Sequence, residues 1–168
     1  MMLLADAVFV VVYATLFAML EIEIEGPHGW AKNLPTKPVI GKYTGYHCIM
    51  NVMVPLTLLY FMWPKYGFWT ALFFIVGWFL VEDFSWFALN PAYTVSKYSK
   101  KYISWHGDCW PLGIPLHNYI GVGLMVFSIF MAGNALLWAS GALMVVLVGV
   151  VVLLSPLYRR AYESVRSK

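Results

Sequence analysis

The stretch YGFWTALFFIVGWFLVEDFSWFAL, residues 66–89, decides the fold. Its only charged side chains are Glu82 and Asp83, near its C-terminal end. A helix of this length crosses the roughly 30 Å hydrocarbon core of a bilayer. Counted from Gly67 at about 1.5 Å per residue, Glu82 lies about 22 Å along that helix, still inside the core. A carboxylate buried there is protonated, paired or bound to a metal, so the run predicts a transmembrane helix that carries part of a functional site.

Four further apolar runs have similar lengths and cover about 3–21, 46–63, 114–132 and 136–157. The chain has 168 residues, of which 61% are hydrophobic and 11% charged, and its mean hydropathy is +0.72. Soluble domains are nearer half apolar and a quarter charged. The sequence therefore predicts an all-α integral membrane protein of the cell or inner membrane. We expect a single transmembrane domain over 1–168, a bundle of five helices.

Lysine and arginine are distributed unequally between the two ends of this bundle. Of the 11 such residues, all but Lys65 fall in the loops 22–47 and 90–113 or in the C-terminal tail. Loops rich in Lys and Arg face the cytoplasm. The sequence therefore predicts an N-terminus outside, a cytoplasmic C-terminus and two long cytoplasmic loops. No basic stripe or nucleic-acid module is present, so we expect no nucleic-acid partner.

The segment EIEIEGPH, residues 21–28, lies where the first helix leaves the membrane. If the helix continues, Glu21 and Glu25 share a face, because residues i and i+4 lie on the same side. If the segment is extended, Glu23 joins them on one face. Carboxylates beside an imidazole, here His28, suit a divalent metal. The alternative is an acidic helix end that is merely solvated.

Two more polar segments map to the same end, WHGDCW at 105–110 and PLHN at 115–118. His106 and Asp108 flank a glycine and can present their side chains together, and His117 opens the fourth helix. The spacing matches no standard zinc motif, and the alternative for each histidine is a structural role at the interface. The predicted metal ligands are Glu21, Glu25, His28, Glu82, Asp83, His106, Asp108 and His117, and the predicted catalytic residues are Glu21, Glu25, Glu82, Asp83 and His117.

Lysines interleaved with tyrosines occupy 93–102, with Lys97, Lys100 and Lys101 as the basic members. Such residues anchor helix ends at the membrane surface, and the sharper interpretation is that they bind an anionic lipid head group.

Glycines in the last two helices carry a packing prediction. Gly121, Gly123, Gly133 and Gly149 are expected to allow close approach between helices. The pair Gly133-Asn134 also predicts the turn between these helices.

These features together predict a small membrane enzyme with its site at the cytoplasmic end, using a divalent metal ion on a lipidic or isoprenoid substrate. The carboxylates outnumber what a single general acid needs. One alternative is a metal-free isomerase or cyclase, in which a buried acid protonates an alkene and aromatic faces stabilise the cation. Others are a proton- or cation-coupled transporter and an accessory subunit of a larger complex. The expected partners are membrane lipids, the lipidic substrate and other membrane subunits or copies of the chain.

Overall fold

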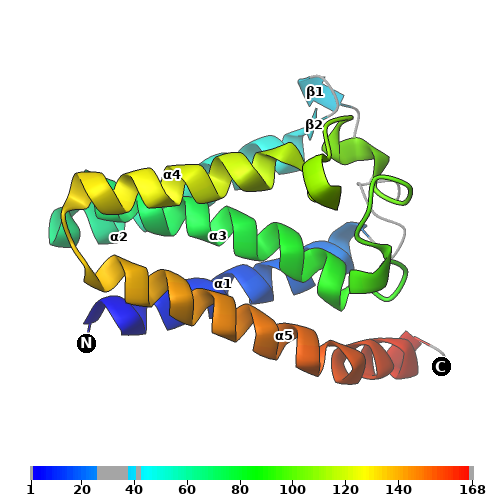
Figure 1. The fold of residues 1–168 in the computed structure, drawn as a ribbon. Helices are drawn as coiled ribbons and strands as arrows, with labels where there is room; N and C mark the ends of the chain where they lie inside the picture. The colour runs from blue at the N-terminus through cyan, green and yellow to red at the C-terminus, as the bar shows by residue number, and fades with distance from the viewer. Residues whose placement is uncertain (1, 26–37, 41–42, 167–168) are drawn as a thin grey trace.

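The computed structural model describes residues 2–25, 38–40 and 43–166, and five long helices account for most of them (Figure 1). These helices are α1 (Met2–Glu25), α2 (Gly45–Tyr66), α3 (Phe68–Leu89), α4 (Leu116–Ala132) and α5 (Leu136–Arg166). All except α4, which has 17 residues, are long and apolar enough to cross a membrane. The fold is therefore helical, as predicted, and it indicates a membrane protein.

Shorter elements connect these helices at one end of the bundle. Three 3-10 turns, η1 (Val95–Lys97), η2 (Ser104–His106) and η3 (Pro111–Gly113), lie between α3 and α4. A small antiparallel pair, β1 (Pro38–Ile40) and β2 (Tyr43–Thr44), precedes α2 and aligns Pro38 with Thr44 and Ile40 with Tyr43. The sequence does not predict this pair, because its strands are too short for a visible alternation of apolar and polar residues.

The two ends of the bundle differ in construction (Figure 1). At the end that we call the turn end, the N-terminus lies beside the short connections after α2 and after α4. Gly67, with φ of 83°, separates α2 from α3. The predicted runs 46–63 and 66–89 leave Pro64-Lys65 between them, so the break lies slightly later in the chain than predicted. Only glycine adopts that φ without strain. At the opposite end, the loop end, lie the end of α1, the strands, the 90–115 segment and the end of α5.

Gly133 and Asn134 form the predicted turn after α4. Gly133 adopts a left-handed conformation and its N–H donates to the carbonyls of Ile129 and Phe130. The side chain of Asn134 accepts a hydrogen bond from the N–H of Leu136 at 3.1 Å. The two residues thus end one helix and cap the start of the next.

Helix α3 is the centre of the bundle, because α1, α2, α4 and α5 all pack against it. Its side chains at Phe73, Phe74 and Phe87 are almost completely buried. This position explains why the decisive stretch is apolar on all sides. It also places Glu82 and Asp83, near the end of α3, among the neighbouring helices rather than in lipid.

Helix α5 continues to Arg166, beyond the predicted end at 157. Its polar last turns find partners on the rest of the bundle. The guanidinium of Arg159 donates to the carbonyl of Ala88 at 2.6 Å, and Arg166 pairs with Glu23 of α1. These contacts stabilise the helical conformation of the polar segment that follows the apolar run of α5.

Of the four glycines that were predicted to allow close approach between helices, only Gly121 lies at a tight helix contact. A Cβ at Gly121 would lie 2.7 Å from Cδ2 of Leu80 on α3. At Gly123 and Gly149 a Cβ would meet nothing within 4 Å, so the prediction is wrong there. Gly133 serves the turn instead.

Candidate functional site

The first group of polar residues forms at the end of α1. This helix remains intact through Glu25, so Glu21 and Glu25 face inward together and the extended alternative does not apply. Glu23 points outward to Arg166. Glu25 is only 3% exposed, and its Oε1 lies 3.0 Å from Nε2 of His47.

Helices α2 and α3 complete this group. The hydroxyl of Tyr46 donates to Oε1 of Glu21 at 3.0 Å, and the carboxyl groups of Glu21 and Glu82 are close enough to interact electrostatically. We call Glu21, Glu25, Tyr46, His47 and Glu82 the acid cluster. The buried Oε1 of Glu82 has no hydrogen-bond partner among the described residues.

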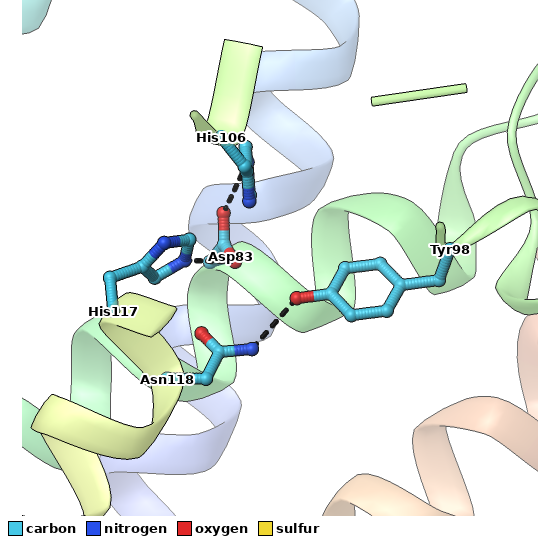
Figure 2. A network of polar contacts seen from close by, with 5 residues as sticks. All are labelled: Asp83, Tyr98, His106, His117 and Asn118. Atoms are coloured by element: carbon cyan, nitrogen blue, oxygen red, sulfur yellow. Dashed lines mark hydrogen bonds and ion pairs between the residues drawn. The ribbon is translucent and has the colours of Figure 1, made fainter. Parts of the chain in front are cut away.

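Asp83 belongs to a second group, on the other side of α3. Consecutive residues of a helix point about 100° apart, because a turn takes about 3.6 residues. Asp83 therefore faces η2 and α4 instead of α1. Its Oδ1 lies 3.3 Å from Nε2 of His106 and its Oδ2 lies 3.5 Å from Nε2 of His117. Figure 2 shows Asp83 between the two imidazoles, and we call these three residues the Asp83 triad.

Packing and hydrogen bonds hold the Asp83 triad in place. The His106 ring packs edge-on against Phe87, with ring centroids 5.2 Å apart. Beside His117, Asn118 donates to the hydroxyl oxygen of Tyr98 at 2.8 Å (Figure 2). Burial raises the pKa of the Tyr98 hydroxyl and the Asp83 carboxylate raises it further, so Tyr98 stays neutral.

One cavity of about 680 Å³ joins the acid cluster and the Asp83 triad at the loop end. Its polar wall comes from both groups and its apolar wall from α1, α2, α3 and α4. The apolar and aromatic lining includes Phe17, Met50, Val76, Trp78, Phe79, Leu80, Trp86, Trp105, Ile120 and Leu124. Titratable groups predicted from distant parts of the sequence therefore line one partly open cavity.

Two predicted ligands are not seen at this cavity. Asp108 is fully exposed and its carboxylate lies 3.3 Å from Nζ of Lys100. The glycine before it allows the chain to turn this side chain away from His106, with φ of 83° at Gly107. His28 lies outside the described residues. The sequence predicts one ligand set, whereas the structure divides the remaining members between two neighbouring groups.

The three predicted head-group lysines are exposed at the loop end. Lys97 donates to the carbonyl of Ala92 at 2.6 Å, and Lys100 donates to the carbonyl of Asp108 at 2.9 Å. Lys101 lies over the ring of Tyr102, 5.4 Å from its centroid. These contacts stabilise the 90–115 segment, and head-group binding stays a prediction.

The sequence does not predict three aromatic residues of the site: Tyr46, which belongs to the acid cluster, and Trp78 and Trp86, which line the cavity. Tyr46 contacts Glu21, and Trp78 and Trp86 flank Glu82 by one helical turn on either side. The spacing of these tryptophans, i−4 and i+4 from a buried acid, is the signal that identifies them, because such residues share a helix face.

Comparisons of the chain with protein-family models, with curated proteins and with solved structures find no match.

Proposed function

We propose that this chain is a small integral-membrane enzyme whose active site is the loop-end cavity. The Asp83 triad holds a divalent metal ion, the acid cluster transfers protons, and the substrate is a lipid. One observation carries this proposal: Asp83, His106 and His117 each offer a ligand atom, and these atoms lie within 4.8 Å of one another. Three elements far apart in the sequence, α3, η2 and α4, supply them.

The spacing of the three ligand atoms fits a metal ion. With bonds of about 2.1 Å, ligands on neighbouring corners lie about 3.0 Å apart in an octahedron and about 3.4 Å apart in a tetrahedron. His106 Nε2 lies 3.3 Å from Oδ1 of Asp83 and His117 Nε2 lies 3.5 Å from Oδ2; the three ligand atoms together lie within 4.8 Å of one another, so the side chains would move slightly closer around an ion. Two imidazoles with one carboxylate suit zinc or iron, and three protein ligands leave positions open for substrate.

The surrounding residues define what the site does. A metal ion here polarises a bound oxygen of substrate or water. Glu21 and Glu82 both line the cavity, and in this proposal the neighbouring carboxyl groups hold one proton between them, which the pair gives or takes back at the reacting group. Trp78, Trp86 and Trp105 line the space and exclude water, which strengthens both effects.

The proposed orientation follows the distribution of charge. Lys97, Lys100, Lys101 and the arginines of α5 all lie at the loop end, so we place that end and the cavity in the cytoplasm. The lysine of the turn end, Lys65, is paired with Asp6 at 3.6 Å. In this arrangement α4 crosses the membrane together with the four longer helices, and the N-terminus is outside.

The acid cluster also supports a second candidate, a metal-free isomerase or cyclase. A carboxyl pair that shares a proton is a general acid, and the aromatic walls suit a carbocation. In that reaction the Asp83 triad only positions the 90–115 segment. The two candidates differ in whether the protein binds a metal ion.

Metal analysis of the purified protein by elemental mass spectrometry tests the first candidate. We expect about one zinc, iron or manganese ion per chain, and at least about a tenfold loss of metal affinity in Asp83→Asn. The matched control is Asp108→Asn, which changes an exposed carboxylate outside the cavity and should keep the metal. Equal metal content in both variants, or none in the natural protein, would favour the metal-free reaction.

A further inference from the structure

The cavity extends from the acid cluster toward the middle of the bundle. Val76 lies about 9 Å from Glu82 along the axis of α3, at about 1.5 Å per residue. At that depth the lining is apolar, with Phe17, Val76 and Leu124 contributed by three helices. A polar end thus continues into a space that suits a hydrocarbon chain.

We place the side opening of this cavity between α2 and α4, which both contribute to its lining. Both helices pack against α3, and over their described residues they make at most marginal contact with each other. Asn51 of α2 and Ile120 and Leu124 of α4 line the cavity, and Ile120 is 55% exposed. These positions lie one to two turns inside their helices, at the depth of lipid tails.

Two unpaired hydrogen-bond donors lie along the cavity, Trp86 at its polar end and Trp78 deeper in the bundle. The indole N–H groups of Trp78 and Trp86 are buried and have no hydrogen-bond partner among the described residues. Both side chains line the cavity, and they are only 2% and 6% exposed. Buried donors are normally satisfied, so these two call for a ligand with an acceptor oxygen.

The charge of the lining restricts that ligand further. Glu21, Glu25, Glu82 and Asp83 all line the cavity, and no lysine or arginine does so among the described residues. A phosphate or carboxylate head group would be repelled by several carboxylates at short range. An uncharged oxygen, as in an alcohol or a ketone, meets the indole donors without that repulsion.

We infer that the cavity binds a single-chain lipid with an uncharged hydroxyl or carbonyl head, which enters from the bilayer between α2 and α4. Its oxygen lies against Trp86, and its chain follows the apolar wall past Trp78 toward Leu124. This inference rests on the proposed function, because it names the substrate class of the same site.

Binding of three radiolabelled probes to the full chain in detergent tests the inference: hexadecanol, hexadecyl phosphate and hexadecane. We expect saturable hexadecanol binding that excess hexadecyl phosphate does not displace. Trp86→Phe removes the N–H and keeps a ring, so hexadecanol affinity should fall about fivefold. Hexadecane affinity of the same variant should not change, which controls for the altered ring volume.

Two matched tryptophan substitutions test the sideways entrance. Leu124→Trp fills the opening and should weaken hexadecanol binding about tenfold or more. Leu153→Trp places the same side chain on the exposed face of α5, where Leu153 is 79% exposed, and should have no effect. Equal effects of the two variants, stronger binding of hexadecyl phosphate, or no saturable binding of hexadecanol would each overturn the inference.

The metal content of the same samples separates this inference from the proposed function. A natural protein that contains metal but binds no hexadecanol would refute the lipid class and leave the metal site standing. A protein that binds hexadecanol without metal, and whose binding is unchanged in Asp83→Asn, would refute the metal site and leave the lipid class standing.

Discussion

Glu82 and Asp83 are adjacent in the chain, yet they serve different neighbours. The helix turns their side chains toward α1 and α4 respectively, so one pair of acids contributes to two chemical groups. Glu82 contacts another carboxyl group, that of Glu21, and Asp83 contacts two imidazoles. Substitution of either residue should therefore have a distinct effect.

Replacement of Glu82 by Gln should leave the protein as stable as before or raise its Tm by a few degrees. Glutamine keeps the shape and can donate to Glu21, and it removes a charge that the carboxylates of Glu21, Glu25 and Asp83 repel. Thermal unfolding in detergent measures this. Metal content should be unchanged, because the Asp83 triad is intact.

Thermal unfolding with added chelator tests whether a bound metal ion stabilises the protein. A ligand that binds only the folded state raises its stability, so chelation should lower the Tm of the natural protein and of Glu82→Gln equally. The control for the loss of a negative charge is Glu163→Gln, which removes an exposed carboxylate of α5. A large loss of stability in Glu82→Gln that ignores chelator would instead show a stranded buried cation, worth about 3–5 kcal/mol, and favour an accessory subunit.

At the scale of elements, the approach of α4 to α3 forms one wall of the cavity. Gly121 makes this approach possible, since its missing side chain leaves room for Leu80. Gly123 lies on the same helix and faces open space. The two positions therefore separate the effect of packing from the effect of helix propensity.

Gly121→Ala and Gly123→Ala should change the Tm in opposite directions. Alanine favours a helix over glycine by about 1 kcal/mol, so Gly123→Ala should raise the Tm slightly. Gly121→Ala adds a Cβ against a branched side chain and should lower it, because overpacking costs about 1–3 kcal/mol. The pair is compared by thermal unfolding in detergent. If Gly121→Ala melts at or above the natural protein, α3 and α4 are not closely packed there.

At the scale of the whole molecule, all the ionisable groups of the cavity lie at one end. Cys109 can report on which side of the membrane that end lies, because its thiol is free and exposed. The variant Cys48→Ala leaves Cys109 as the single thiol. A second variant lacking both native cysteines, with Ala135→Cys, places a thiol at the turn end.

Labelling of intact cells with a membrane-impermeant maleimide should modify the thiol at position 135 and leave Cys109 unmodified. Both thiols should react after lysis, which controls for accessibility. Modification of Cys109 alone in intact cells would reverse the orientation. Equal modification of both would mean that α4, the shortest helix, does not cross the membrane.

The sequence by itself determines the helices and the end at which the polar residues gather. Burial of charge in hydrocarbon is so costly that apolar runs and their polar boundaries predict the helices within a few residues, and α5 departs from its run only where polar contacts extend it. The turn at Gly133-Asn134 is equally local in origin. The joint location of Glu21, Glu82, Asp83, His106 and His117 at one end follows from helices that alternate in direction.

Only the tertiary structure decides which of these groups touch. Helices α1 and α3 are apolar on nearly every face, so no stripe in their sequences shows how each is rotated about its axis. That rotation sends Glu82 to Glu21 and Asp83 to the histidines, and it leaves Asp108 in solvent. Local spacing places Trp78 and Trp86 on the face of Glu82, but only the packing of α3 against its neighbours decides that this face lines the cavity.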